Sequence, residues 1–142
     1  MGESAETTLA ALAALTGDVV SAAVLWYSPI DLTAVHPDDP EGPEGRLIRG
    51  APAQHSEAAL RASPISHVSA KAPPFLLVHG TEDEALPPVH SERLHALLLD
   101  AGVSSTYVPV AGAGHTFTGY LDTAGLVDAA VAFLAGHLLD RV

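Results

Sequence analysis

The sequence contains no cysteine, few basic residues and no long hydrophobic run. Without cysteine the chain can form neither a disulfide framework nor a Cys-based zinc site. The cysteine count therefore does not indicate whether the protein works in an oxidising or a reducing compartment. Six basic residues stand against 17 acidic ones, a formal net charge of −11. Nucleic acids and anionic membranes both require a basic surface, and a bilayer span requires roughly 18 consecutive apolar residues. We therefore expect neither a nucleic-acid nor a membrane partner.

The composition that remains is that of a folded domain. Hydrophobic residues make up 48% of the 142 residues and charged ones 16%, which is enough for a single core of ordinary size. Residues 1–17 carry acidic side chains and no basic leader, so we expect no secretory signal and a cytoplasmic location. We expect residues 1–142 to form one domain.

Hydrophobic patterning predicts strands that alternate with helices. Three stretches rich in β-branched and aromatic residues have the pattern of buried parallel strands, namely 19–28, 75–79 and 104–110. Helical spacing of apolar residues marks 9–16, 88–100 and 121–139. Pro109 places the third strand at a sheet edge, because proline donates no ladder hydrogen bond. This alternation predicts an α/β domain of about three parallel strands with flanking helices.

Residues 36–66 are expected to form a loop or insertion. The first part, 36–52, is dense in proline, glycine and acidic residues. A short helix is expected at 56–62, capped by Ser56 and ending before the Ser63-Pro64 pair. A segment of this kind can act as a lid over a site.

Three candidate functional residues follow the three predicted strands. Asp31, Asp83 and His115 each come shortly after a strand. Because sites in open α/β sheets lie beyond the carboxyl ends of the strands, we expect these side chains at one edge of the sheet. A histidine and a carboxylate are two of the groups that nucleophilic acyl transfer requires, together with a hydroxyl and donors for the oxyanion.

The stretch GESAETTLAALAALTG, residues 2–17, resembles the nucleophile elbow and following helix of α/β-hydrolase esterases. The blocks that follow in order resemble the same esterase/lipase branch, which includes hormone-sensitive-lipase-like and feruloyl-esterase-like enzymes: WYSPIDL (26–32), ASPISHVSAKAPPFLLVHGTEDEALP (62–87), AGV (101–103) and GAGHTF (112–117). The resemblance implies a partial α/β-hydrolase fold that begins at the elbow.

The same resemblance implies a catalytic triad. It places the nucleophile at Ser4, the orienting carboxylate at Asp83 and the base at His115, in the family's chain order. The Ala5 amide would supply part of the oxyanion hole. A small carboxylic ester is the implied substrate, with no cofactor and no metal.

Each role has a structural alternative. His115 can be a structural loop histidine, and Asp83 can be a carboxylate that favours the start of the helix at 88–100. Asp31 is the alternative acid. His79 is expected to pack at a strand end, and we read no metal site from the remaining histidines.

The chain also departs from the family pattern. It has no H-G-G stretch to supply oxyanion donors, Glu6-Thr7 replaces Gly-Gly after the nucleophile, and Thr116 stands where glycine is usual. The strand at 19–28 lacks an inner neighbour, so we expect a homodimer or a missing amino-terminal half to cover its edge.

Two functional classes follow. One is a serine hydrolase that cleaves carboxylic esters. The other is an inactive truncated remnant, or one half of a split hydrolase that acts through assembly with another chain. A peptidase of the prolyl-oligopeptidase kind fits less well, because G-x-S-A is the esterase form of the elbow.

Overall fold

The structure is a computed structural model that describes residues 3–139, with side chains from 6 to 138. A parallel sheet with the order β1-β2-β3 forms its centre. The strands are β1 (Ala23–Trp26), β2 (Phe75–Gly80) and β3 (Ser105–Val110). Ala23 lies opposite Phe75, which in turn lies opposite Ser105. The predicted α/β class, with parallel strands flanked by helices, is confirmed.

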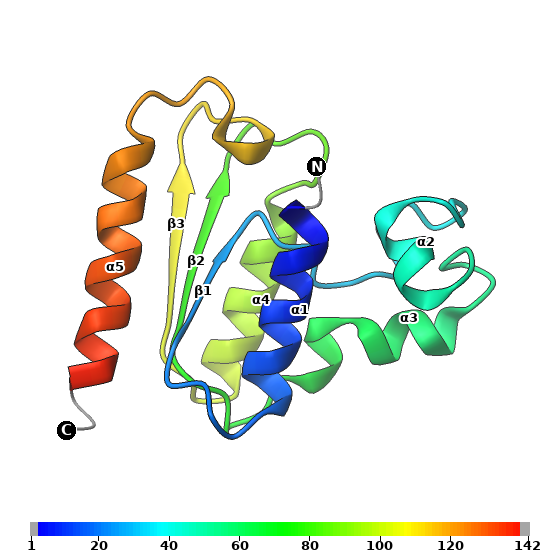
Figure 1. Ribbon diagram of the computed structural model, residues 1–142, viewed down its shortest axis with the longest axis horizontal. Helices are drawn as coiled ribbons and strands as arrows, with labels where there is room; N and C mark the ends of the chain where they lie inside the picture. Colours follow the sequence, from blue (N-terminus) through cyan, green and yellow to red (C-terminus); the bar gives the residue numbers. More distant parts are fainter. Residues whose placement is uncertain (1–2, 140–142) are drawn as a thin grey trace.

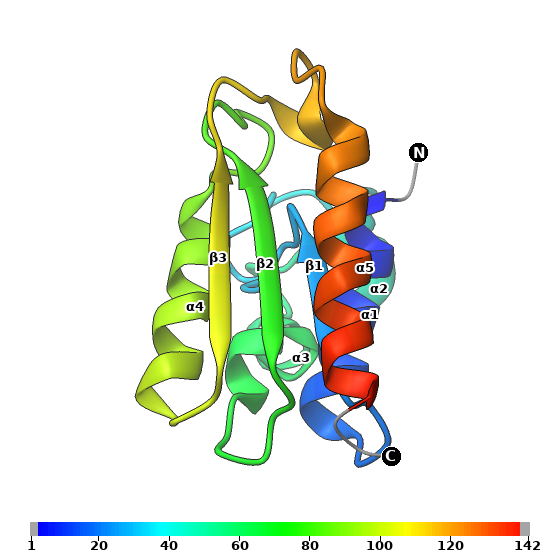
Figure 2. The same cartoon turned by 90° about the vertical axis from the view of Figure 1, so that its left-hand side faces the viewer.

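Three helices cover the two faces of this sheet. α1 (Glu3–Thr16) and α4 (Val89–Asp100) lie on one face, and α5 (Thr123–Leu139) lies on the other (Figures 1 and 2). The patterning predicted all three helices, although α1 begins well before residue 9.

β2 is the central strand, and every residue in it is buried. Because successive side chains of a strand point to opposite faces, Phe75 and Leu77 join the core beneath α1 and α4. Leu76 and Val78 join the core beneath α5. A strand buried on both faces explains the unbroken apolar run that marked this segment in the sequence.

β1 is shorter than the predicted 19–28. Its ladder begins at Ala23, whose N–H donates to the Pro74 carbonyl at 2.9 Å. β2 starts only at Phe75, directly after two prolines, so β1 has no strand partner before Ala23. Val19 is 88% exposed, although its residue type favours a strand. At the other side of the sheet, the predicted edge position of β3 is confirmed.

The segment between β1 and β2 carries two short helices and a 3₁₀ turn. α3 (Ser56–Ala62) matches the prediction, except that His55 occupies the N-cap position and Ser56 begins the helix. η1 (Pro64–His67) follows it. α2 (Pro43–Ile48) lies within 36–52, where only a loop was expected. Figure 1 shows α2 and α3 beside the layered body of the sheet and its helices.

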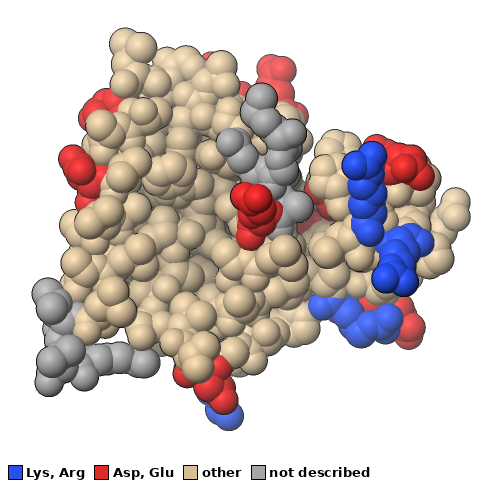
Figure 3. All heavy atoms as spheres, viewed as in Figure 1, with Lys and Arg blue, Asp and Glu red and all other residues tan. Residues whose placement is uncertain are grey.

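Proline at the first helical position favours the start of α2. The helix ends at Ile48 and is capped by Arg49, whose φ of 62° is left-handed. On the face shown in Figure 3, basic side chains gather over the α2–α3 region. Among residues 3–139, no helix combines the length and apolar character needed to cross a membrane.

Candidate active site

The loops after β2 and β3 are joined by backbone hydrogen bonds. The Thr81 N–H donates to the Val110 carbonyl and the Glu82 N–H to the Ala113 carbonyl, both at 3.0 Å. Gly80 permits this approach, because a Cβ there would overlap the Ala113 carbonyl oxygen. The close backbone contact therefore fixes where the two predicted site residues of these loops stand.

Asp83 and His115 are in direct contact. His115 Nδ1 lies 2.7 Å from Asp83 Oδ2, and the other carboxylate oxygen accepts the Leu86 N–H at 2.8 Å. The Asp83 side chain is 0% exposed and that of His115 is 30% exposed. Because Asp83 can only accept when ionised, Nδ1 carries the proton and Nε2 is left as the basic nitrogen. This is the tautomer that a general base requires.

The turn that carries His115 is strained. Thr116 has a φ of 56° and Phe117 a φ of 58°, a left-handed region that a β-branched residue rarely adopts. The turn is closed by the Gly114 N–H, which donates to the Thr118 carbonyl at 2.9 Å. Thr116 thus occupies a position whose backbone conformation suits the glycine that is usual in the family.

Tyr27 packs beside the His115 ring and is itself in contact with Phe117. The Tyr27 ring centroid lies 5.2 Å from that of His115 and 5.0 Å from that of Phe117, the latter edge-on. Tyr27 directly follows β1 and has a φ of 40°. The aromatic contact limits how far the imidazole can turn, so the ends of all three strands contribute to its position.

His79 also contacts Asp83, which the sequence analysis did not predict. Its Nε2 lies 3.1 Å from Asp83 Oδ2 and 2.8 Å from the Leu86 carbonyl oxygen. Its Nδ1 lies 2.7 Å from Ser91 Oγ. Burial of His79 lowers its pKa below the ordinary histidine value. No signal in the sequence marked this contact, because His79 lies in a strand and Asp83 in the loop that follows it.

Asp31, the alternative acid, belongs to another network. Its Oδ2 accepts from Arg93 Nη1 at 2.8 Å, and its Oδ1 accepts the Thr33 N–H at 3.1 Å. Burial raises the pKa of Asp31, but the hydrogen bonds from Thr33 and the charge of Arg93 outweigh burial and leave it lowered. Asp83, rather than Asp31, is the carboxylate that meets His115.

The two histidines of α4, His90 and His95, have separate partners. His90 accepts the Ile30 N–H at 3.4 Å and His95 Nδ1 lies 2.8 Å from Ser105 Oγ. Within residues 3–139, no group of three or more acidic or histidine side chains is arranged to hold a metal ion.

The predicted nucleophile Ser4 and the oxyanion residue Ala5 lie in the first turn of α1. Their side chains fall outside the described part of the chain. The views agree that α1 begins at the end of the sheet where the loops after β2 and β3 stand (Figures 1 and 2).

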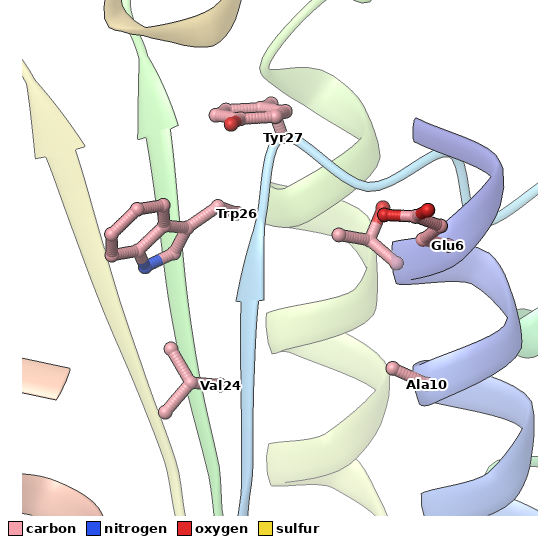
Figure 4. Close-up of a pocket in the computed structure, with 6 residues that line it drawn as sticks. Glu6, Ala10, Val24, Trp26 and Tyr27 are labelled. Atoms are coloured by element: carbon pink, nitrogen blue, oxygen red, sulfur yellow. The ribbon is translucent and has the colours of Figure 1, made fainter. Parts of the chain in front are cut away.

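An open hollow of about 400 Å³ lies between the start of α1 and β1. In Figure 4, Glu6 on α1 and Tyr27 after β1 stand on opposite sides of it. The hollow is lined by Glu6, Thr7, Ala10, Val24, Trp26 and Tyr27. Glu6 therefore brings a carboxylate to a depression that also reaches the aromatic neighbour of His115.

Residues 1–98 match the model of the family described as BD-FAE. Esterase LipQ of Mycobacterium tuberculosis is 34% identical over 133 residues, which cover 82% of this chain and 32% of LipQ. A probable carboxylic ester hydrolase of the same organism, LipM, is 36% identical over 72 residues, 48% of this chain and 17% of LipM. The chain thus spans about a third or less of the length of these curated relatives.

Solved structures show the same fold. A truncated form of a carbohydrate esterase from gut microbiota aligns with a TM-score of 0.82 and 27% identity, covering 94% of this chain and 57% of that one. A puromycin-hydrolyzing peptidase of Mycobacterium tuberculosis aligns with a TM-score of 0.67 and 28% identity, covering 80% of this chain and 18% of that one.

Proposed function

Because this chain belongs to the BD-FAE family of α/β-hydrolases, we propose that it acts as a serine hydrolase of carboxylic esters. The observation that carries the proposal is the contact between the buried Asp83 carboxylate and His115 Nδ1 at 2.7 Å. Its position at the carboxyl ends of β2 and β3 is where α/β domains place their sites. The esterase names of LipQ and LipM support an ester as the substrate class.

In the proposed reaction, His115 Nε2 takes the proton of Ser4 Oγ while that oxygen bonds to the ester carbonyl carbon. The carbonyl oxygen becomes an oxyanion, which the Ala5 N–H helps to stabilise. His115 then returns the proton to the alkoxide as the C–O bond breaks, and the alcohol leaves an acyl-enzyme. A water molecule then attacks the acyl carbon while His115 Nε2 takes its proton. The acid is released when the bond to Ser4 Oγ breaks and His115 returns the proton to that oxygen. Asp83 holds His115 in the required tautomer and stabilises the imidazolium.

The test is hydrolysis of a short p-nitrophenyl ester by the purified chain and by Ser4→Ala and His115→Ala. We expect both variants to fall to the background rate. Ser69→Ala is the matched control, because Ser69 is exposed and precedes β2 at the opposite end of the sheet. Equal rates in the wild type and Ser4→Ala would contradict the proposal.

A second proposed function is that of one half of a split hydrolase. The sequence has no H-G-G stretch, and the loss of one oxyanion donor typically costs about 100- to 1,000-fold in rate. Another chain would then supply the missing donors. Hydrolysis that appears only on mixing with the partner chain would support this second function over the first.

A further inference from the structure

Asp83 is a fully buried charge surrounded by hydrogen-bond donors. Oδ1 accepts the Leu86 N–H, and Oδ2 faces both His115 Nδ1 and His79 Nε2. A buried carboxylate is stable only when its oxygens are hydrogen-bonded. Two imidazoles therefore share one carboxylate oxygen, and only the His115 imidazole is partly exposed.

The surroundings of His79 define its protonation. Nε2 faces two acceptors, Asp83 Oδ2 and the Leu86 carbonyl, so this nitrogen carries a proton. Nδ1 faces the Ser91 hydroxyl at 2.7 Å, which can donate to it. The lowered pKa of His79 that results from its burial agrees with a neutral ring. His79 is thus a neutral imidazole with its proton on Nε2, and Ser91 holds that tautomer.

The Nε2 proton of His79 is hydrogen-bonded to the first and the last residue of the turn 83–86. It is shared between the Asp83 carboxylate at 3.1 Å and the Leu86 carbonyl at 2.8 Å, while the Leu86 N–H returns to Asp83 Oδ1 at 2.8 Å. The turn 83–86 is therefore clamped onto β2 by one side chain. Without it, the Asp83 carboxylate would keep Leu86 and His115 as donors but lose its link to the central strand.

We propose that His79 is a positioning residue of the site, which, together with Ser91, holds the Asp83 carboxylate in the orientation that His115 requires. The proposal rests on the function proposed above, since it assigns His79 to the same Asp83–His115 pair. A hydrogen-bonded chain runs from Ser91 on α4 through His79 on β2 to Asp83 and His115. Rigid elements thus support a pair that stands on two loops.

The competing explanation is that His79 only fills space beneath α4. A second histidine–serine pair offers a control for this explanation: His95 Nδ1 on α4 lies 2.8 Å from Ser105 Oγ on β3. The Asp83 carboxylate is hydrogen-bonded to Leu86, His79 and His115, and not to this pair. Substitutions in this pair remove a half-buried hydrogen bond between α4 and the sheet, but they leave the Asp83 network intact.

The experiment measures the Nδ1 proton of His115 by NMR in chain labelled with ¹⁵N-histidine. The signal is assigned by its loss in His115→Ala, and its exchange with water is compared among variants. We expect exchange in His79→Leu to be about tenfold faster or more, as for loss of one hydrogen bond to a charged group. His79→Gln, which retains an N–H donor, and His95→Leu should stay near wild type.

A folded His79→Leu variant with the wild-type signal and exchange rate would overturn the proposal. If His79→Leu fails to fold, the exchange rate of the His115 Nδ1 proton is compared between Ser91→Ala and its control Ser105→Ala. We expect faster exchange only in Ser91→Ala, because the His79 ring then loses the donor that holds its tautomer. Equal exchange in the two serine variants would also overturn the proposal.

Ester hydrolysis is the second readout. Where the wild type is active, His79→Leu should lower kcat by up to about 100-fold, as expected for a misplaced catalytic group, with a smaller change in KM. A wild type that shows the His115 signal but no hydrolysis would refute the proposed function and leave the role of His79 standing. The two failures are therefore distinguishable.

Discussion

At the level of single residues, the site depends on which carboxylate faces His115. Asp83 combines complete burial with donors on both oxygens. Asp31 is bound to Arg93, a side chain that is 55% exposed. A carboxylate that must orient a base benefits from burial, because few competing partners can reach it. Asp83 therefore faces His115, whereas Asp31, the alternative acid, is bound to Arg93.

We expect Asp83→Asn to abolish most of the ester hydrolysis. An amide at this position can donate to His115 Nδ1 and so favours the wrong tautomer, a change that costs about 10⁴-fold in kcat in serine proteases. The p-nitrophenyl assay measures the loss, and Asp31→Asn serves as the control that should remain close to the wild-type rate. The reverse ranking of the two variants would make Asp31 the orienting acid.

At the level of the elements, the site is built where β2 ends against the loop after β3. Gly80 is the last residue of β2, and the Ala113 and Gly114 carbonyl oxygens lie 2.2 and 2.8 Å from the position that its Cβ would occupy. These contacts are with backbone, which cannot move aside as a flexible side chain could. The central strand thus sets the distance between Asp83 and His115.

We expect Gly80→Ala to lower the free energy of unfolding by about 1–3 kcal/mol, the usual cost of overpacking, and to weaken the Asp83–His115 contact. Urea denaturation measures the first effect. The control is Gly136→Ala on α5, where nothing lies within 4 Å of the added Cβ. This variant should be more stable by up to about 1 kcal/mol, because alanine favours a helix more than glycine does. Equal stability of Gly80→Ala and the wild type would show that the loop can shift.

At the level of the whole molecule, one edge of β1 has no strand neighbour among residues 3–139. The Ala23 N–H donates to the Pro74 carbonyl directly before β2, and the Tyr27 N–H donates to the Val78 carbonyl in β2. In a parallel ladder the backbone of Val24 and Trp26 therefore faces the other way. Trp26 Nε1 is buried and has no hydrogen-bond partner among the described residues. The hollow between α1 and β1 runs along this edge. Such an edge recruits another strand.

We propose that a second copy of the chain covers this edge in solution. Sedimentation velocity should then show a dimer whose fraction rises with concentration. Ala10→Lys places a charge in the hollow and should weaken the dimer, whereas Ala132→Lys on the exposed face of α5 should not. A monomer at every concentration would refute the dimer, and a preceding half of the protein would then be the occupant to test.

The stability of the folded chain should fall at mildly acidic pH. Burial lowers the pKa of both His79 and His90, whereas in the unfolded chain both return to about 6.5. Below that pH the unfolded chain binds protons that the folded chain does not, so the free energy of unfolding decreases as the pH falls. Each histidine contributes at most about 1.4 kcal/mol per pH unit.

The urea midpoint measures this dependence. We expect it to be lower at about pH 5.5 than at about pH 7.5, with a smaller difference in His79→Gln, which has no titrating ring. A midpoint that is equal or higher at the lower pH would contradict the neutral state inferred for His79.

The strands and the long helices could be predicted from residue patterns because burial imposes them locally. The first four residues of β2, 75–78, are apolar because they fill the cores on both faces of the sheet, and this pattern can be recognised without knowing the neighbouring segments. α2 was not predicted because contacts with residues that precede it help to stabilise this short helix. The buried Glu44 of α2 pairs with His36, and Gly45 packs on the backbone of Asp39 and Pro40.

The residues of the site divide in the same way. Asp83 and His115 could be named in advance, because each follows a buried strand in a recognisable motif. The contact of Asp83 with His79 and the link from His79 to Ser91 could not, since they depend on how α4, β2 and two loops pack together. Residue type and order along the chain are local properties that carry the fold and the candidate chemistry. The tautomers, the satisfied buried charge and the exposed edge of β1 are relations between distant segments, and they exist only once the chain is packed.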